Sequence, residues 1–267
     1  MEVVLPGQAP RKYLMTFARY PSLQGKSVIV TGGASGIGEA IVRAFCEQGS
    51  RVGFADLDGE RGAALAAELT AAGRSAQFAR CDLRDVNELK VAFAALAQAH
   101  GAARVLVNNA ARDDRHRWQD VDPAYWDERI ASNLRHMFFA IQAVAPAMIA
   151  AGGGSIVNLG SDSWHRAIGG LPVYATCKAA VHGLTRSFAR ELGPQRIRVN
   201  TVVPGWTMTE RQKRLWVTEE GLAGHKAQQC LPDMVQPEDV ARMVLFLGSD
   251  DAPSCTAHNF MVDAGVI

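Results

Sequence analysis

Short runs rich in β-branched and apolar residues alternate with segments of helical composition along almost the whole chain. The strand-like runs cover residues 27–30, 52–55, 76–81, 105–108, 155–159, 199–203 and 259–262. The main helix-like segments cover residues 36–48, 60–72, 86–99, 123–140 and 174–192. Such alternation is typical of a parallel sheet with helices on both faces. We therefore predict an α/β protein built on a doubly wound parallel sheet of about seven strands.

The chain has 267 residues, and no linker rich in Ser, Gly or Pro divides it. We predict one domain, residues 25–267, preceded by a peripheral N-terminal extension, residues 1–24. The connection between the sixth strand and the last helix, residues 206–234, is unusually long. Because long loops in compact domains are often functional, we predict that this segment is a lid that selects the substrate.

The charge balance excludes some classes of partner. Lys and Arg number 28 against 27 Asp and Glu, so the formal net charge is +1. Such a balance provides no field to hold nucleic acid or an anionic membrane, and neither is an expected partner. Gln142 and Pro146 interrupt the most apolar segment, residues 137–154, which favours a buried helix over a membrane span.

The N-terminus has no apolar stretch of signal-peptide length, so we expect a cytoplasmic protein. The chain has 5 cysteines, which are scattered along it without a Cys-x-x-Cys pair or a nearby His-x-x-x-His. We expect reduced thiols and no metal site.

A glycine-rich loop, TGGASGIG at residues 31–38, lies between the first strand and the next helix. Gly32, Gly36 and Gly38 allow a tight turn, a close approach of backbone to a pyrophosphate, and close packing of helix on strand. Such loops also occur as plain turns. The strand before the loop and the helix after it favour dinucleotide binding.

Asp56 ends the second strand, where an acidic side chain can accept hydrogen bonds from the adenosine ribose hydroxyls. A carboxylate there repels a 2′-phosphate, which favours NAD over NADP. The alternative is that Asp56 only caps the turn in ADLDGE. Arg61 is the nearby cation that argues for NADP, but its place inside the helix makes it a poor phosphate clamp.

Tyr174 and Lys178 stand four residues apart in YATCK, so both face the same side of a helix. An adjacent ammonium and an oxidised nicotinamide favour the phenolate, which makes Tyr174 a candidate general base. A chance surface pair is the alternative at this spacing. Ser161 ends the fifth strand at the sheet edge where ligands bind, and its hydroxyl can steady a substrate oxygen.

Together these motifs resemble the short-chain dehydrogenase/reductase family from about residue 22 to the end of the chain. The resemblance rests on TGGASGIG, Asp82 with Leu83, NNAA at 108–111, Asn133, Ser161, YATCK and PGWTMT at 204–209. It implies a single Rossmann-type domain, a homotetramer, and a catalytic tetrad of Asn133, Ser161, Tyr174 and Lys178. Asn133 is implied to hold a water that links Lys178 to solvent.

The same resemblance implies that Lys178 binds the nicotinamide ribose, that Asp82 and Leu83 meet the adenine, and that residues 204–209 meet the carboxamide. The full set of implied cofactor-binding residues is Gly32, Ser35, Gly36, Ile37, Gly38, Asp56, Asp82, Leu83, Asn109, Ala110, Tyr174, Lys178, Pro204, Gly205, Thr207 and Thr209. Ala111 and Thr207 depart from the family pattern, which has glycine and an aliphatic residue there. Neither departure removes a catalytic group.

Within the family, segments 112–130, 133–138 and 161–165 resemble bacterial NAD-dependent sugar dehydrogenases of the D-xylose and L-arabinose type. This implies oxidation of an aldopyranose at C1 to the aldonolactone. Candidate substrate residues are Asp113, Asp114, Arg115, His116, Ser161, Ser163, Trp164, His165 and Tyr174. The alternative for the run at 113–117 is a solvated loop. For Arg135 and His136, packing or an intersubunit role is open beside catalysis. For Trp118, Tyr125 and Trp126, a core or interface role is open beside that of a sugar platform.

Two other functions stay open. One is a dehydrogenase of the same family that acts on another secondary alcohol or a 3-oxoacyl group, although acyl reductases usually use NADPH, which Asp56 disfavours. The other is a catalytically silent nucleotide-binding protein, against which the intact tetrad argues.

Overall fold

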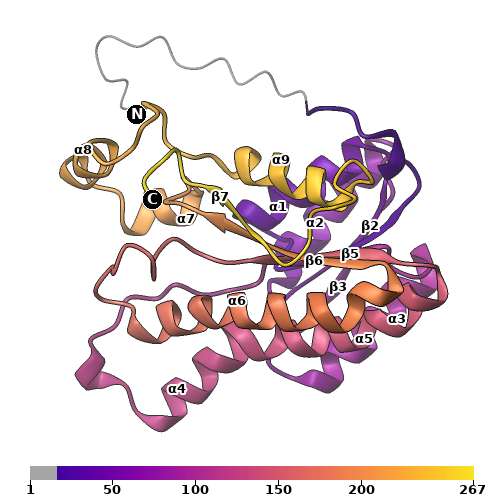
Figure 1. The fold of residues 1–267 in the computed structure, drawn as a ribbon, viewed down its shortest axis with the longest axis horizontal. Coiled ribbons are helices and arrows are strands. Elements are labelled where there is room, and N and C mark those ends of the chain that lie inside the picture. Colours follow the sequence, from indigo (N-terminus) through magenta and orange to yellow (C-terminus); the bar gives the residue numbers. More distant parts are fainter. Residues whose placement is uncertain (1–16) are drawn as a thin grey trace.

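The structure, a computed structural model, describes residues 17–267, and seven parallel strands form a single sheet at its centre (Figure 1). The strands are β1 (Ser27–Thr31), β2 (Arg51–Asp56), β3 (Ala76–Arg80), β4 (Val105–Asn108), β5 (Gly154–Leu159), β6 (Ile197–Pro204) and β7 (Asn259–Val262). Each predicted strand is present. The predicted α/β class and its parallel sheet are therefore confirmed.

The strand order is β3-β2-β1-β4-β5-β6-β7. From β1 the chain proceeds to β2 and β3 on one side and returns to β4 on the other. Thr31 at the end of β1 is in register with Asn108 at the end of β4, so the two strands end at the same level. The loops that leave them diverge in opposite directions. This is the topological switch point at which doubly wound sheets bind ligands.

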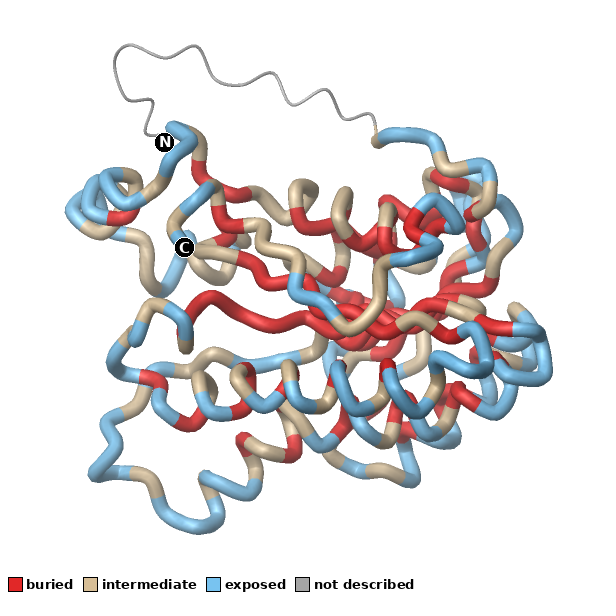
Figure 2. The backbone as a smooth tube through the Cα atoms, viewed as in Figure 1, coloured by how far each residue is buried: buried red, intermediate tan, exposed pale blue. Residues whose placement is uncertain are grey.

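Successive side chains along each strand point to opposite faces of the sheet, so the hydrophobic core consists of two layers. Val28 and Val30 on β1 face one cluster with α1 (Gly36–Glu47) and α9 (Pro237–Gly248). Ile29 faces a second cluster with α3 (Val86–His100) and α5 (His136–Ala150). Figure 1 shows α1, α2 and α9 on one face of the sheet and α3, α5 and α6 on the other. Figure 2 shows the strands buried between helices whose outer faces are exposed.

Local capping explains where several helices begin. The Asp58 side chain accepts a hydrogen bond from the backbone N of Arg61 at the start of α2. The Asp85 side chain accepts from the backbone N of Asn87 and Glu88 at the start of α3. The described α-helices are α1 (Gly36–Glu47), α2 (Gly59–Ala71), α3 (Val86–His100), α4 (Pro123–Ile130), α5 (His136–Ala150), α6 (Pro172–Leu192), α7 (Glu210–Leu215), α8 (Glu219–Lys226) and α9 (Pro237–Gly248).

The segment predicted as one helix over 123–140 differs in the structure. It is α4, then a π-helical turn at Ala131–Arg135, then α5, which continues to Ala150. Of α5, Met137 and Ile141 are fully buried, but Phe138 is 44% and Ile149 43% exposed. The prediction of a wholly buried apolar helix is therefore correct for one face only. No helix among residues 17–267 is long and apolar enough to cross a membrane.

The predicted N-terminal extension overlaps the core. Residues 1–16 lie outside the described part of the chain, but Phe17 and Tyr20 pack against the cluster that holds α1 and α9, and Leu23 is fully buried. The backbone N of Tyr20 donates to Gln48 Oε1 at 2.9 Å. The end of the extension is thus part of the packed domain, contrary to the expectation that it is peripheral.

The long connection 206–234 carries two short helices, α7 and α8. The hydroxyls of Thr209 and Thr218 accept hydrogen bonds from the first turns of α7 and α8 respectively. Met208 precedes these helices and Val235 follows them. The backbone N of Met208 donates to Val235 O at 2.9 Å, so the two ends of the segment are joined. The connection is therefore an ordered excursion above the carboxyl edge of the sheet.

Candidate active site

A cleft of about 1000 Å³ opens at the carboxyl edge of the sheet, over the switch point between β1 and β4. All the cofactor-side residues expected from the sequence line it: Gly32, Ser35, Gly36, Ile37, Gly38, Asp56, Asp82, Leu83, Asn109, Ala110, Tyr174, Lys178, Pro204, Gly205, Thr207 and Thr209. The loops that follow six successive strands therefore meet around one space.

The glycines of the loop are needed for close packing. A Cβ on Gly38 would lie 1.8 Å from the carbonyl oxygen of Gly32, and a Cβ on Gly32 would lie 2.7 Å from Cα of Ala110. Gly32 and Gly36 also have φ angles of +66° and +57°, which favour glycine. The backbone therefore forms a tight cradle where α1 begins. Its free N–H groups and the helix dipole suit a pyrophosphate.

Asn109 ties this cradle to β4. Its Nδ2 donates to the carbonyl oxygens of Thr31 at 3.1 Å and Gly32 at 2.9 Å, and its backbone N donates to Thr31 Oγ1 at 3.0 Å. The side chain thus holds the glycine loop in place. Contact of Asn109 with the cofactor stays a prediction.

Asp56 faces the cleft and also supports the loop. Its Oδ2 accepts from the backbone N of Ala34 at 3.0 Å, and its Oδ1 accepts from the backbone N of Asp58 at 3.0 Å. The carboxylate therefore also makes the turn interaction that was the alternative to ribose binding. Arg61 lines the same cleft, where it pairs with Asp58 at 3.5 Å. The expectation that Arg61 lies too far along its helix is wrong, because α2 begins only two residues earlier.

Asp82 is oriented by an ion pair. Arg84 Nη2 contacts Asp82 Oδ2 at 2.6 Å, and Arg84 Nη1 contacts Glu128 Oε1 at 3.0 Å. The hydrogen bond from Arg84 holds the pKa of Asp82 below its usual range. Leu83 beside it is 8% exposed. This part of the cleft thus has a fixed charge pattern and an apolar neighbour.

Lys178 lies in the second turn of α6 and is 1% exposed. Its Nζ donates to the carbonyl oxygen of Leu159, the last residue of β5, at 2.7 Å. The same Nζ lies 5.6 Å from the centre of the Tyr174 ring. Burial lowers the pKa of Lys178 to about 8. The predicted Tyr and Lys pair is therefore an internal pair and not a surface pair.

The pKa of Tyr174 differs from the expectation. Burial raises it well above the usual value for tyrosine, the negative charge of Asp113 raises it further, and a hydrogen bond with Ser161 acts in the opposite direction. For the chain on its own, the raised pKa is opposite to the effect expected from the adjacent ammonium. The physical reason is desolvation of the phenolate, and the expected effect of an oxidised nicotinamide stays a prediction.

Ser161 connects Tyr174 with the turn after β5. Its Oγ lies 3.0 Å from Ser163 Oγ and accepts from the backbone N of Ser163 at 3.1 Å. Ser161, Ser163 and Tyr174 all line the cleft. Two hydroxyls and the phenol can therefore share a hydrogen-bonding network around one substrate oxygen.

Asn133 is fully buried in the π-helical turn and does not line the cleft. Its Oδ1 accepts from the backbone N of Arg112 at 2.8 Å, and its Nδ2 donates to the carbonyl oxygen of Arg129 at 3.0 Å. The side chain thus joins the turn to the loop after β4. The water that it was expected to hold for Lys178 stays a prediction.

His136 has a packing role, one of the alternatives left open by the sequence. It is 1% exposed, and its Nε2 lies 3.0 Å from the carbonyl oxygen of Ala110. Burial lowers its pKa to about 3, with a further contribution from the positive charge of Lys178. The neutral ring therefore donates to Ala110 and supports the loop after β4.

Three of the substrate candidates turn away from the cleft, and the first is His116. Its Nδ1 lies 3.0 Å from the carbonyl oxygen of Asp114 and 2.9 Å from Tyr125 Oη, and its Nε2 accepts from the backbone N of Val173 at 3.3 Å. Both ring nitrogens are occupied. His116 therefore joins the loop after β4 to the start of α6 and does not line the cleft.

Trp164 and His165 are the other two. Their rings stack at 3.6 Å between centroids, and Trp164 packs edge-on against His182 of α6 at 4.7 Å. Neither residue lines the cleft. The turn that follows Ser163 directs both side chains against the outer side of α6, so their expected contact with substrate is wrong for this structure.

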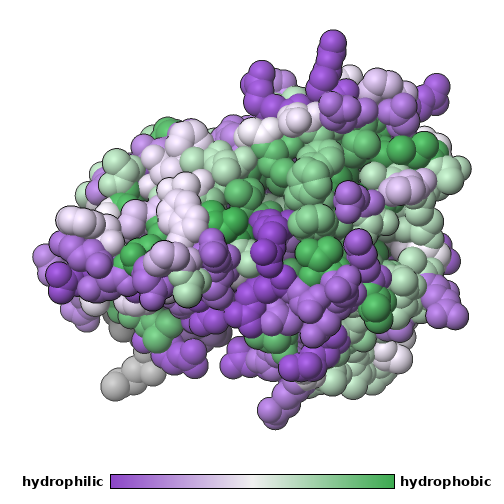
Figure 3. All heavy atoms as spheres, turned by 90° about the horizontal axis from the view of Figure 1, so that it is seen from below, coloured by the Kyte–Doolittle hydropathy of each residue, from purple (hydrophilic) through white to green (hydrophobic). Residues whose placement is uncertain are grey.

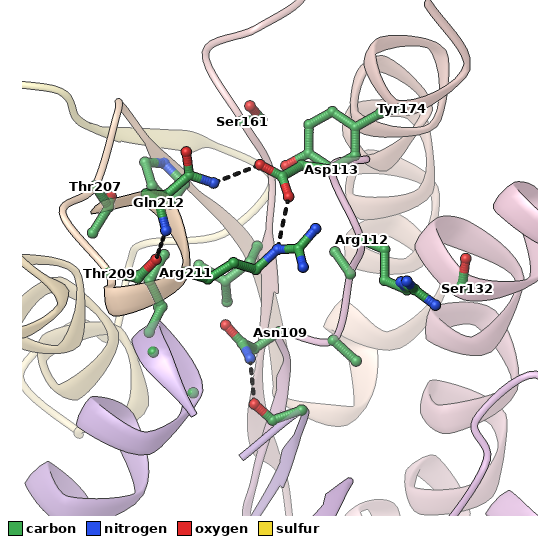
Figure 4. A pocket seen from close by; sticks show the side chains of 18 of the residues that line it. Asn109, Arg112, Asp113, Ser132, Ser161, Tyr174, Thr207, Thr209, Arg211 and Gln212 are labelled. Atoms are coloured by element: carbon green, nitrogen blue, oxygen red, sulfur yellow. Dashed lines mark hydrogen bonds and ion pairs between the residues drawn. The ribbon is translucent and has the colours of Figure 1, made fainter. Parts of the chain in front are cut away.

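Asp113, Asp114 and Arg115 meet residues of the long connection. Arg211 Nη2 contacts Asp114 Oδ1 at 2.6 Å. Gln212 Nε2 donates to Asp113 Oδ2 at 2.6 Å (Figure 4). The guanidinium of Arg115 lies 5.3 Å from the centre of the Trp216 ring. The run at 113–117 is therefore partly a cleft wall and not only a solvated loop.

Comparison with known proteins agrees with this geometry. A family model described as "Enoyl-(Acyl carrier protein) reductase" matches residues 32–267. A D-xylose 1-dehydrogenase of Caulobacter vibrioides is 51% identical over 251 residues, which cover 94% of this chain and 99% of that protein. The chain belongs to the short-chain dehydrogenase/reductase family. It is thus an oxidoreductase with a nicotinamide cofactor and a Rossmann-type fold.

Other members of the family are also similar. The "Probable galactose dehydrogenase GalD" of Rhizobium meliloti is 46% identical over 93% of this chain and 98% of that protein. Among solved structures, a short-chain type dehydrogenase/reductase from Mycobacterium ulcerans matches with a TM-score of 0.87 and 28% identity, over 92% of this chain and 90% of that one. A 7 alpha-hydroxysteroid dehydrogenase complexed with NADH matches with a TM-score of 0.88 and 30% identity, over 92% and 96%.

Within this short-chain dehydrogenase/reductase, sequence reasoning missed five residues of the long connection that line the cleft: Trp206, Glu210, Arg211, Gln212 and Trp216. The region was predicted to select substrate, but only Thr207 and Thr209 were singled out in it, as cofactor-binding residues. A signal was present, because Arg211 and Gln212 follow Thr209 in a TER start that predicts a short helix. No pattern in the neighbouring sequence predicts that these side chains contact residues 113 and 114, which lie almost 100 positions earlier in the chain.

Proposed function

We propose that this protein oxidises an aldopyranose at C1 to the aldonolactone with NAD as the oxidant. The observation that carries the proposal is the meeting of the glycine loop with Ser161, Tyr174 and Lys178 in one cleft. The relatives named as a D-xylose 1-dehydrogenase and a galactose dehydrogenase support a sugar as the substrate. A neutral polyhydroxylated substrate is also consistent with the near-zero net charge of the chain.

The cleft fits a dinucleotide. We assign the pyrophosphate to the cradle at Gly32, Gly36 and Gly38, whose tight backbone leaves no room for a Cβ on Gly32 or Gly38 against the neighbouring protein atoms. We assign the adenosine ribose to Asp56, whose carboxylate favours NAD over a 2′-phosphorylated cofactor. Leu83 and the paired Asp82 flank the adenine in this arrangement, and residues 204–209 accompany the carboxamide.

The bound cofactor supplies the acceptor for a hydride from C1 of the sugar. Tyr174 takes the proton of the anomeric hydroxyl, and Ser161 orients that oxygen by a hydrogen bond. The C1–H bond breaks with its electron pair, and the C1–O bond becomes the carbonyl of the lactone. Hydrolysis of the lactone then gives the aldonic acid.

Formation of the Tyr174 phenolate needs added positive charge, because burial raises the pKa of this group in the chain on its own. The guanidinium of Arg115, which lowers the pKa of Tyr174, the ammonium of Lys178 and an oxidised nicotinamide are cations that favour the phenolate. We assign Lys178 to the nicotinamide ribose as well. Asn133 completes the proposed tetrad by holding the π-helical turn, through which a water links Lys178 to solvent.

For the substrate side we retain Asp113, Ser161, Ser163 and Tyr174, which line the cleft. The carboxylate of Asp113 and the two serine hydroxyls offer acceptors and donors for sugar hydroxyls. We assign the segment 206–234 the role of a substrate lid, because α7 contributes Arg211 and Gln212 to the same cleft.

We further propose a cytoplasmic homotetramer. The face formed by α5 and α6 gathers hydrophobic side chains (Figure 3). On it, the 44% exposed Phe138 packs against Phe188 at 5.2 Å between ring centroids. An exposed apolar face of this kind favours association with a second copy. Sedimentation of the purified protein tests the stoichiometry.

The experiment that tests the activity follows the absorbance of NADH: its formation from NAD with a panel of pentoses, hexoses and cyclohexanol, and its consumption with 3-oxoacyl thioesters. Turnover of sugars alone supports the proposal. Turnover of cyclohexanol or reduction of an acyl thioester without any sugar activity favours the dehydrogenase of another substrate class. Binding of NADH without turnover of any compound favours a silent nucleotide-binding protein.

A further inference from the structure

Gln212, the third residue of α7, bridges Trp206 and Asp113. Its backbone N donates to Thr209 Oγ1 at 3.2 Å, which fixes the start of this short helix. Its side-chain Oε1 accepts from Trp206 Nε1 at 3.0 Å, and its Nε2 donates to Asp113 Oδ2 at 2.6 Å. The side chains of Trp206, Gln212 and Asp113 all line the cleft.

The chemistry of the two partners determines how the amide is oriented. An indole N–H only donates, and an ionised carboxylate only accepts. The oxygen of the Gln212 amide must therefore face Trp206, and its NH₂ must face Asp113. Glutamate at position 212 would keep the shape and lose the donor, so this site distinguishes two nearly isosteric side chains.

Asp113 connects this bridge with the reacting groups. Its carboxylate lies beside the Tyr174 hydroxyl in the cleft (Figure 4), and its negative charge raises the pKa of Tyr174 and also that of Lys178. The Asp113 side chain is 23% exposed, so the carboxylate keeps accessible acceptor positions. Arg211 Nε lies 3.4 Å from Asp113 Oδ1, and Asp114 and Arg115 are the charged neighbours in the same loop.

An acceptor in this place selects for a donor on the substrate. Because the ionised carboxylate has no proton to offer, it binds a hydroxyl and disfavours an ether or carbonyl oxygen. Its position beside the proposed base places the bound hydroxyl on the carbon next to the one that is oxidised. A site built to bind such a hydroxyl strongly disfavours the analogue that lacks it.

We propose that Gln212 is a positioning residue that holds the Asp113 carboxylate as the acceptor for the C2 hydroxyl of the sugar, and so determines which aldoses are oxidised. The inference rests on the proposed sugar oxidation. It goes beyond that function because it names the specificity contact and the lid residue that orients it.

The test compares Gln212→Ala and Gln212→Glu with the unaltered protein, using an aldose that the unaltered protein oxidises, its 2-deoxy analogue and its 4-deoxy analogue. Lys213→Gln is the matched control, since Lys213 lies on the same helix, is half exposed and pairs only with Glu210 among the contacts described for residues 17–267. The measurements are kcat, the KM for sugar and the KM for NAD.

For Gln212→Ala we expect the sugar KM to rise about tenfold or more, as for loss of a hydrogen bond to a charged group. The preference for the parent sugar over its 2-deoxy analogue should shrink, the preference over the 4-deoxy analogue should stay, and the KM for NAD should stay near its original value. For Gln212→Glu the sugar KM should recover toward acidic pH, because two facing carboxylates can share one proton there.

An unchanged 2-deoxy preference in both Gln212 variants, with the unaltered protein active on sugars, overturns this inference and leaves the proposed function intact. An equal rise in the KM for sugar and for NAD, without acid recovery of Gln212→Glu, shows a structural role only and also overturns it. Failure of the unaltered protein to oxidise any aldose overturns the proposed function together with the inference.

Discussion

Lys178 Nζ donates a 2.7 Å hydrogen bond to the carbonyl oxygen of Leu159, the residue that ends β5 two positions before Ser161. This contact fixes a buried ammonium between α6 and the end of the strand that leads to Ser161. The arrangement keeps the donor groups of the cleft in a constant relation to one another. Its consequences for activity can be tested.

Replacement of Lys178 by Met keeps the length of the side chain and removes the charge. We expect kcat to fall by about 10² or more, since the variant loses the cation that favours the Tyr174 phenolate. The KM for NAD should rise as well. Steady-state kinetics check both values, with Lys213→Met on α7 as the exposed control. Normal kcat in Lys178→Met would refute the assignment.

The change Tyr174→Phe removes only the proposed proton acceptor. We expect a fall in kcat of roughly 10² to 10⁴, with nearly unchanged affinity for NADH measured by fluorescence. Tyr125→Phe is the matched control, because the Tyr125 hydroxyl contacts His116 at 2.9 Å outside the cleft. Its activity should stay within a few-fold of the original. Near-normal turnover of Tyr174→Phe is the result that contradicts the proposed mechanism.

Asp113 controls the pH dependence of the proposed base. Oxidation should speed up as pH rises, because the phenolate is the active form. Burial and the negative charge of Asp113 both raise the pKa of Tyr174. Asp113→Asn removes that charge, so the phenolate forms more easily and the rising limb of log kcat against pH should move to lower pH. A limb that stays in place, or moves to higher pH, argues against Tyr174 as the titrating group.

Asp56→Ala should raise kcat/KM for NADP relative to NAD, because the repulsion of a 2′-phosphate disappears. Loss of the 3.0 Å hydrogen bond from Ala34 N should also weaken binding of both cofactors. The double variant with Arg61→Ala should lose part of the gained NADP activity, since Arg61 lines the same cleft. An unchanged NADP to NAD ratio in Asp56→Ala means that another residue selects the cofactor.

Because His136 is buried and neutral, we expect the free energy of unfolding to decrease in acid. Its pKa is lowered to about 3 by burial, whereas an unfolded histidine titrates near 6.5. Below pH 6.5 the unfolded chain therefore binds a proton that the folded chain does not, and stability falls until the pH reaches about 3. We expect a loss of about 2 kcal/mol from pH 7 to pH 5.

Urea unfolding at several pH values measures this effect. His136→Gln, which retains a donor for Ala110, should show a smaller decrease in the free energy of unfolding between pH 7 and pH 5. His258→Gln makes the same change at an exposed position and should keep the original slope. Identical slopes for all three proteins would show that other groups cause the acid sensitivity.

Local patterns were sufficient for the fold and for much of the cleft. Alternation between β-rich and helical segments predicted the seven parallel strands, and the glycine loop predicted the cradle at Gly32, Gly36 and Gly38. Both signals depend on neighbouring residues, because strand and helix periods and positive φ angles are local properties. The π-helical turn at Ala131–Arg135 had no such signal, and the segment was predicted as one helix.

The sequence by itself therefore determined the sheet, the carboxyl edge where its loops meet and the residue types that carry redox chemistry. Only the tertiary structure decided which polar side chains face the cleft: His116 and Trp164 turn to α6, whereas Gln212 reaches Asp113. It also decided the pKa of Tyr174 through burial. The physical reason is that side-chain direction and desolvation depend on packing between segments far apart in the chain, which no local pattern encodes.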